Sequence, residues 1–397
     1  MIFFLFPIVI ITNPAPTIRS NLSNITYKDH ICHLTKNEGN MNNEKIASKI
    51  ESTFRKKVQN DKKLHNAYLL VHSEKYGIHL NIAEGSTGKV PADPQQPVYM
   101  ASVGKIFTSV LISMLYEQGK LSFVDGLDKY LDADLLKNLH VFKGKDYTKE
   151  IKIRHLLTHT SGLYDSFWPL LNQMLENPDF NINPKDAITW GKENQKPYFP
   201  PGKKMKYTDT NYYLLGLIIE EITGKEFHEI LHEYIFDPLG MRQSYMLHVS
   251  DPIEKPSYPL AKFFMDGRDI SNIKSYAGID YAGGGVVARP EDLLIFMKAL
   301  VNYQIIKKET LEIMKNDHSR FLIFHEYGYG VMHFKGIPLL MPNKLSSWGH
   351  AGATGAFMFY NPTTESIIIG NFNDASYTSK GVQFMLSKIL SKLVKCE

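Results

Sequence analysis

The sequence predicts a mixed fold of the α/β (α+β) class, with one antiparallel sheet, helices packed on it and a helical domain inserted into the chain. Runs typical of strands lie near both ends, at 66–71, 78–82 and 327–372. Between about 135 and 280 the apolar spacing is mostly helical. A sheet assembled from both ends of the chain, with the helical part between them, satisfies this order.

Composition narrows the function classes. The chain has 397 residues, of which 43% are hydrophobic and 22% charged, as in an ordinary globular enzyme. A net charge of +4 without a dense basic run gives no reason to expect a nucleic-acid partner. The two cysteines, Cys32 and Cys396, make neither a disulfide framework nor a metal site. They pair only if the termini meet, and two free thiols fit the sequence equally well.

The first 43 residues predict a signal-like segment followed by a polar tail. Met1–Ile11 is apolar but too short to span a membrane, and Ala15 supplies a small residue downstream. No lysine or arginine precedes the apolar run, which counts against a signal. We expect a secreted or periplasmic protein without a stable membrane span. Translation from Met41, where an amphipathic helix opens and continues to about Lys63, would instead make it cytoplasmic.

The remaining elements divide the chain into two structural parts. Residues 44–134 contain a hairpin and a long buried helix. Residues 281–397 contain glycine-rich loops, strands and a closing helix at 382–394. Together these two ranges predict the sheet domain. Residues 135–280 predict the helical domain, with helices near 168–176, 184–194, 209–223 and 227–235. We expect the functional site at the seam of these parts, where ligand sites are common.

Ser102-Val-Gly-Lys105 opens the buried helix, which continues to Tyr116 and is stopped by Gly119. Ser102 and Lys105 project from one face of the first turn. A serine hydroxyl becomes a nucleophile when a neighbouring base takes its proton. The Ser-x-x-Lys pattern also begins at Ser86 and Ser271, but neither of these opens a buried helix. The alternative is a capping serine beside a solvated lysine.

Two more clusters carry chemistry. Tyr207-Thr-Asp209 directly precedes an apolar helix, so the phenol can point into a cleft, where a nearby ammonium lowers the pKa of a phenol and lets it act as a base. The alternative is a core tyrosine with a satisfied hydroxyl. His350 stands among glycines ahead of a strand, which can offer a backbone N–H to an anionic oxygen; the alternative is a structural histidine in a bend.

We expect no metal and no cofactor. His155 and His159 stand four residues apart, but the glutamate of a zinc-protease helix is missing between them.

These clusters, in this order, resemble the serine β-lactamase and penicillin-binding-protein superfamily, in its branch of class C β-lactamases, D-alanyl-D-alanine carboxypeptidases and related esterases. Ser102-Val-Gly-Lys105, Tyr207-Thr-Asp209 and His350-Ala-Gly352 match its three motifs. Phrases such as His159-Thr-Ser-Gly-Leu163 and Gly283-Gly-Gly285 are similar to the family as well. The resemblance covers about residues 44–395 and implies a β-lactamase/transpeptidase-like fold.

The resemblance implies a role for each matched residue. Ser102 would be the acylated nucleophile, and Lys105 would take its proton or hold Tyr207 as a phenolate. Tyr207 would protonate the leaving group and then activate water. The backbone N–H groups of Ser102 and Ala353, next to Gly352, would bind the oxyanion. His350 would stand where β-lactamases carry a lysine that attracts the substrate carboxylate, and a mostly neutral imidazole attracts it less.

Asp209 is the clearest departure from the family, which has asparagine there. A carboxylate cannot donate a hydrogen bond to a substrate amide carbonyl, so we expect weak β-lactam turnover. The leading interpretation is a serine hydrolase with an acyl-enzyme on Ser102, either an esterase or a D-Ala-D-Ala carboxypeptidase-like enzyme. The alternatives are a D-aminopeptidase in which Asp209 pairs with the substrate ammonium, and a non-catalytic penicillin-binding-like sensor. The sequence leaves the oligomeric state open.

Overall fold

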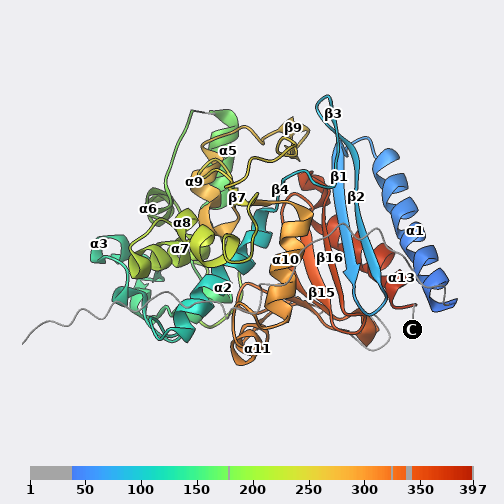
Figure 1. The fold of residues 1–397 in the computed structure, drawn as a ribbon. Helices are drawn as coiled ribbons and strands as arrows, with labels where there is room; N and C mark the ends of the chain where they lie inside the picture. The colour runs from blue at the N-terminus through green and yellow to red at the C-terminus, as the bar shows by residue number, and fades with distance from the viewer. Residues whose placement is uncertain (1–37, 178, 323–324, 337–341, 396–397) are drawn as a thin grey trace, which may run out of the picture. The chain divides into compact units, whose positions relative to one another are not determined.

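The largest sheet of the protein is antiparallel and takes its strands from both ends of the chain (Figure 1). The computed structural model describes residues 38–177, 179–322, 325–336 and 342–395. Within these residues the main sheet has nine strands in the order β11-β12-β13-β14-β15-β16-β1-β2-β3. Its strands are β1 (Asn66–Ser73), β2 (Ile78–Thr87), β3 (Val90–Pro91), β11 (Ser319–Leu322), β12 (His325–Tyr327), β13 (Met332–Phe334), β14 (Ser347–Ala351), β15 (Phe357–Asn361) and β16 (Ser366–Asn371).

The interior strand β1 is buried on both faces of the sheet, which explains its nearly continuous apolar sequence. Tyr68 and Leu70 enter the core on one face, whereas Leu69 and Val71 enter the core on the other. Pairing of β1 with β16 joins the N-terminal hairpin to the C-terminal strands, with Leu70 opposite Ile369. The predicted sheet from both chain ends is therefore confirmed.

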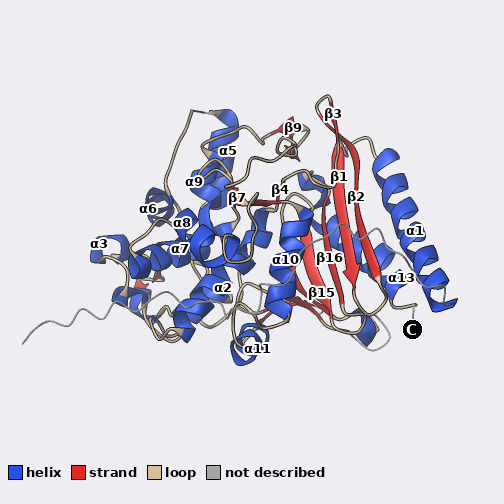
Figure 2. Ribbon diagram, viewed as in Figure 1, coloured by secondary structure: helices blue, strands red, loops and turns tan. Residues whose placement is uncertain are grey.

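Helices cover both faces of this sheet (Figures 1 and 2). One face carries α1 (Glu38–Gln59), α12 (Thr378–Phe384), the π-helix η8 (Met385–Leu390) and α13 (Ser391–Leu393). The other face carries α2 (Gly104–Glu117) and α10 (Pro290–Val301), and α11 (Lys308–Asn316) follows α10. None of the described helices is long and apolar enough to cross a bilayer.

The segment between α2 and α10 is mainly helical, as predicted. Its helices are η2 (Leu127–Lys129), α3 (Ala133–Leu136), η3 (Thr148–Glu150), α4 (Ile153–Leu157), α5 (Phe167–Glu176), α6 (Pro184–Asn194), α7 (Thr210–Thr223), α8 (Phe227–Leu231), η4 (His232–Phe236), α9 (Tyr276–Asp280) and η5 (Tyr281–Gly283). Short strand pairs join them: β5 (Val141–Phe142) with β6 (Lys145–Asp146), and β8 (Phe264–Met265) with β9 (Arg268–Asp269).

A small sheet leads the chain into the buried helix α2. In it β4 (Val98–Tyr99) pairs with β10 (Val286–Ala288), which also pairs with β7 (Tyr245–Met246). The helix α2 is buried on nearly every face and packs against α7 and β14. The division of the chain into 44–134 with 281–397 and 135–280 as separate domains stays a prediction.

Two local predictions need correction. The run 327–334, expected as one strand, is divided between β12 and β13, because Gly328 and Gly330 place a turn there. Gly330 has φ +66°, which favours glycine. The first helix begins at Glu38, earlier than expected. The signal-like segment before it and both cysteines lie outside the described residues.

Candidate active site

Ser102 lies on a tight turn between strand β4 and helix α2. The residue before it, Ala101, has φ +48°, a left-handed conformation that costs a non-glycine residue about 1–2 kcal/mol. The short 3₁₀-helix η1 (Ala101–Val103) then continues into α2. Gly352, just beyond β14, lets the sheet approach this turn, because a Cβ at Gly352 would lie 2.6 Å from the Met100 carbonyl oxygen. The fold therefore holds Ser102 against the end of β14.

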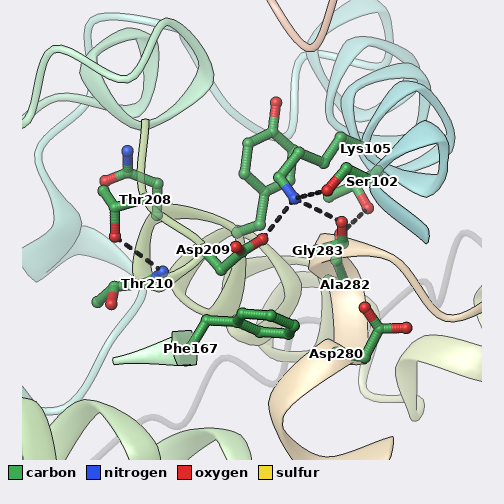
Figure 3. A network of polar contacts seen from close by, with 12 residues as sticks. Ser102, Lys105, Phe167, Thr208, Asp209, Thr210, Asp280, Ala282 and Gly283 are labelled. Carbon is green, nitrogen blue, oxygen red and sulfur yellow. Dashed lines mark hydrogen bonds and ion pairs between the residues drawn. The ribbon is translucent and has the colours of Figure 1, made fainter. Parts of the chain in front are cut away.

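Lys105 is fully buried and its ammonium has three acceptors (Figure 3). Its Nζ lies 3.2 Å from Ser102 Oγ, 2.5 Å from Asp209 Oδ1 and 2.6 Å from the Gly283 carbonyl oxygen. An ammonium has three protons to donate, so these contacts satisfy it. Gly283 must be small here, since a Cβ would lie 2.8 Å from Asp209 Oδ1. The structure thus joins Ser102, Lys105 and Asp209, as the sequence predicted.

Tyr207 completes the group around Lys105. The Lys105 Nζ lies 5.0 Å from the centre of the Tyr207 ring. The Tyr207 hydroxyl is buried and makes no hydrogen bond of standard geometry with the described residues. Burial and the Asp209 carboxylate hold the pKa of Tyr207 well above its usual value, although the Ser102 hydroxyl opposes this rise. The expected lowering of this pKa is therefore wrong, because burial disfavours the phenolate and the nearby Asp209 carboxylate repels it.

An aromatic layer lies behind Lys105 and Tyr207. The His159 ring lies 4.1 Å from the Tyr207 ring, and its Nδ1 faces the Thr208 N–H and the Asn211 amide at 3.3 and 3.0 Å. Since Nδ1 accepts these hydrogen bonds, the neutral His159 carries its proton on Nε2. Burial holds the pKa of His159 well below its usual value. This layer fixes the Tyr207 ring from behind.

His350 belongs to this layer and does not line the cleft. It is fully buried, and its Nε2 lies 2.9 Å from the Tyr327 hydroxyl. Strand β14 turns the His350 side chain toward the core, while Ala351, Gly352 and Ala353 line the cleft. The sequence placed His350 where a substrate carboxylate binds. The structure instead puts one layer of protein between this imidazole and the cleft.

Ser102 opens into a cleft of about 580 Å³. Both structural parts predicted from the sequence contribute to it. One wall consists of residues that precede α10, namely Tyr99, Ala101, Ser102, Phe167, Trp168, Tyr207, Asp209, Tyr276 and Asp280. The other wall comes from the C-terminal strands and helices, namely Met332, Phe334, Ala351, Gly352, Ala353, Thr378, Ser379, Val382, Gln383 and Leu386.

The two walls differ in polarity. The first wall, which we name the acidic wall, carries the carboxyl groups of Asp209 and Asp280. The second, which we name the apolar wall, presents Met332, Phe334 and Leu386 beyond the end of β14. No lysine, arginine or histidine is among the described residues that line the cleft. The Ala353 N–H, at the end of β14, makes no hydrogen bond to another described residue, so it is available to an anionic oxygen.

Two carboxyl groups near Lys105 escaped the sequence analysis. Burial raises the pKa of Asp280 to about 7 and that of Asp165 to about 7, with the Asp209 charge adding to both shifts. Asp165 accepts hydrogen bonds from the Asp209 and Phe167 N–H groups at 3.1 and 3.4 Å. A signal existed for Asp280, which stands three residues before Gly283-Gly-Gly285. Nothing in the sequence marked Asp165. No group of three or more side chains able to hold a metal ion occurs among the described residues.

Comparison with known proteins agrees with this geometry. The family model described as Beta-lactamase matches residues 58–384. Similar curated proteins include the putative penicillin-binding protein PbpX of Bacillus subtilis, 27% identical over 72% of this chain and 67% of its own length. Penicillin-binding protein 4* of the same organism is 32% identical over 40% of this chain and 32% of its own length. Teichoic acid D-alanine hydrolase of Staphylococcus aureus is 25% identical over 60% of this chain and 54% of its own length. Thus the chain spans only about a third of one of these relatives and about half of another.

Solved structures share the fold. A D-stereospecific amidohydrolase from Streptomyces sp. has a TM-score of 0.71 at 21% identity, covering 86% of this chain and 98% of its own. The D-amino acid amidase from Ochrobactrum anthropi SV3 has a TM-score of 0.71 at 20% identity, covering 89% and 98%. At such identities the likeness concerns the fold alone, and it confirms the predicted β-lactamase/transpeptidase-like class.

The fold and the Ser102–Lys105–Tyr207 group define a β-lactamase-related serine hydrolase class, which confirms the class predicted from the motifs. The chain belongs to the Beta-lactamase family.

Proposed function

We propose that this protein hydrolyses esters or amides through an acyl-enzyme on Ser102, most simply as an esterase. The contact of 3.2 Å between Ser102 Oγ and Lys105 Nζ, at the floor of the cleft, carries this proposal. Lys105 passes a proton to Asp209, 2.5 Å away, and the resulting amine takes the proton of Ser102 as Oγ attacks the substrate carbonyl. The backbone N–H groups of Ser102 and Ala353 bind the oxyanion.

Tyr207 acts on the leaving group in this proposal. Its raised pKa keeps the phenol protonated at neutral pH, which suits a general acid. Its hydroxyl gives a proton to the departing oxygen or nitrogen, and the phenolate then takes a proton from the water that hydrolyses the acyl-enzyme. His159, stacked on Tyr207, and His350, behind β14, are positioning residues rather than groups that touch substrate.

The charge of the cleft argues against carboxypeptidase activity. Peptides ending in D-alanine and β-lactams both carry a carboxylate, and no described cationic side chain lines the cleft to attract it. We therefore favour an enzyme that acts on neutral or cationic substrates over a D-Ala-D-Ala carboxypeptidase. We expect its β-lactamase activity to be weak. The acidic wall also supports the second candidate, a D-aminopeptidase, and intact nucleophile geometry counts against the non-catalytic sensor.

A fluorophosphonate probe tests the proposal. It phosphonylates a serine hydroxyl only where that hydroxyl is activated, so we expect labelling of the protein and its loss in Ser102→Ala. Ser86→Ala is the matched control, because Ser86 begins another Ser-x-x-Lys sequence and should keep full labelling. In p-nitrophenyl acetate hydrolysis, Ser102→Ala should lose at least about 10³-fold in kcat. Equal labelling of Ser102→Ala and the unmodified protein would overturn the proposal.

The compartment is a smaller part of the proposal. We favour a secreted or periplasmic location, because named relatives include penicillin-binding proteins. Cell fractionation with an antibody against the folded protein distinguishes this from a cytoplasmic location.

A further inference from the structure

The acidic wall contains a carboxyl group with no cationic partner. Asp280 is 5% exposed and lines the cleft, and it accepts hydrogen bonds from the Gly285 N–H and from Tyr99. Neither of these donors carries a charge. The Tyr99 hydroxyl in turn lies 2.9 Å from the Tyr276 hydroxyl, which fixes both rings beside the carboxyl group. Asp280 is thus held by two uncharged donors, and no cationic side chain among the described residues hydrogen-bonds to it.

Lys105 is surrounded by three carboxyl groups. In addition to burial, the Asp209 charge raises the pKa of both Asp165 and Asp280. The Lys105 ammonium lowers the pKa of both carboxyl groups. Lys105 is already paired with Asp209 at 2.5 Å. Asp165 is turned toward backbone N–H groups and does not line the cleft. Asp280 is therefore the carboxyl group that can meet a positive charge brought by a ligand.

Aromatic rings accompany Asp280 at this end of the cleft. Phe167 and Trp168 line the same wall, and Trp168 is 48% exposed, so its ring is accessible. Figure 3 shows the Phe167 side chain in the neighbourhood of both Asp209 and Asp280. Carboxylates combined with aromatic faces favour ammonium ions, because the ring faces are electronegative. A carboxylate-bearing substrate would be repelled from the same place.

We propose that the cleft binds the ammonium group of its substrate beside Asp280, against the rings of Phe167 and Trp168. The preferred substrates are then esters or amides that carry an amine, and Asp280 is a specificity-determining residue. This inference rests on the proposed acyl-enzyme function. The ammonium group belongs either to the acyl part or to the leaving group, and the experiment separates these two cases.

Pairs of isosteric substrates provide the test. D-alanine p-nitroanilide and isobutyryl p-nitroanilide differ in an ammonium group against a methyl group on the acyl side. Acetylthiocholine and S-(3,3-dimethylbutyl) thioacetate differ in the charge of the leaving group. For at least one pair we expect kcat/KM to favour the charged member by about tenfold or more, which is the range of a cation held by a carboxylate and aromatic rings.

Asp280→Asn tests the residue itself. Asparagine keeps an acceptor for the Gly285 N–H but removes the charge. We expect the charged-to-neutral ratio to fall about tenfold through KM, with the neutral substrate changed less than about threefold. Asp132→Asn, at an exposed site outside the cleft, should leave the ratio unchanged. Thermal unfolding establishes that each variant is folded.

The outcomes separate the two proposals. The ammonium site is overturned if the charged-to-neutral ratio of kcat/KM is near one for both pairs, or if the preference survives in folded Asp280→Asn. Labelling of Ser102 by the fluorophosphonate would still support the hydrolase in either case. Absence of Ser102 labelling and of turnover for both neutral substrates overturns the hydrolase itself. If Asp280→Asn does not fold, Trp168→Ala, at an exposed ring, should lower the same ratio, and an unchanged ratio there overturns the inference.

Discussion

The two walls of the cleft perform different tasks with different parts of the chain. The acidic wall holds Tyr207, Asp209 and Asp280, the first two of which would move protons in the proposed reaction. The apolar wall offers backbone N–H groups at the end of β14 and aliphatic or aromatic surface from Phe334 and Leu386. In this comparison, the acidic wall would carry out the reaction and select substrates by charge. The apolar wall would select substrates by the shape of their apolar group.

The difference has a physical cause. Strand β14 is held between β13 and β15, so the turn that follows it places the Ala353 N–H at a fixed position without needing a particular side chain. Helix ends and loops instead bring together side chains from distant positions, such as Lys105, Asp209 and Asp280. A change on the acidic wall should therefore alter the reaction or the selection of charged substrates, whereas a change on the apolar wall should alter only the choice of the apolar group of the substrate.

Of the substitutions that distinguish the two walls, replacement of Tyr207 should lower kcat the most. Tyr207→Phe keeps the ring packed on His159 but removes the hydroxyl that serves as general acid. We expect kcat for p-nitroanilides to fall about 10²–10⁴-fold. Esters of p-nitrophenol, whose leaving group needs no proton, should be less affected. An equal loss for both substrate types in steady-state assays would remove Tyr207 from leaving-group protonation.

Replacing Asp209 should change which substrates acylate Ser102. Asp209→Asn supplies an N–H donor for the acylamide carbonyl of a penicillin while keeping an acceptor near Lys105. We expect covalent labelling by a fluorescent penicillin to rise about tenfold relative to labelling by the fluorophosphonate. The ratio of the two labels corrects for any general loss of serine reactivity. A constant ratio would show that the carboxylate does not exclude penicillins.

A change on the apolar wall should have a smaller effect, restricted to substrate choice. Leu386→Ala removes apolar surface from the cleft, so hydrolysis of octanoyl esters should fall about 5–20-fold while acetyl esters keep their rate. The measurement is kcat/KM over a series of p-nitrophenyl esters. Gln383→Ala on the same wall is a control of similar location without the loss of apolar contact. An equal loss for acetyl and octanoyl esters would contradict the division of tasks between the walls.

The pH dependence of stability should show the smallest effect and again concerns the acidic wall. Because burial raises the pKa of Asp280 from 3.8 to about 7, the folded state holds a proton that the unfolded state releases between these values. This contribution to the free energy of unfolding is complete below pH about 4 and is lost as the pH rises to about 7. Asp280→Asn should therefore gain in melting temperature relative to the unmodified protein between pH 5 and 8. A pH-independent difference would mean that Asp280 ionises normally.

Sequence motifs predicted much of the candidate site, because the motif residues lie close together along the chain. Ser102 and Lys105 lie one helical turn apart, so helix geometry alone brings them together. The apolar run of 106–116 indicated that this turn is buried, and the strand-like runs at 66–71 and 366–372 indicated a sheet from both ends of the chain. The roles assigned to these residues stay predictions until the variants above are measured.

Other features depend on contacts between distant segments. The pKa of Tyr207 reverses its expected direction because the fold buries the phenol hydroxyl and places the Asp209 carboxylate close to it. His350 fits its motif, yet the register of β14 turns it toward Tyr327 and the core. Neither outcome follows from residue spacing, since both depend on which element packs against which.

By itself the sequence determined the family and the class of fold and predicted the nucleophile with its lysine, because short-range spacing and apolar periodicity are properties of the chain. Only the tertiary structure decided that Asp280 and the aromatic rings line the same cleft as Ser102, without a cation among the described lining residues. The physical reason is burial: a carboxyl group becomes unusual only when folding removes its water and leaves it without a partner charge.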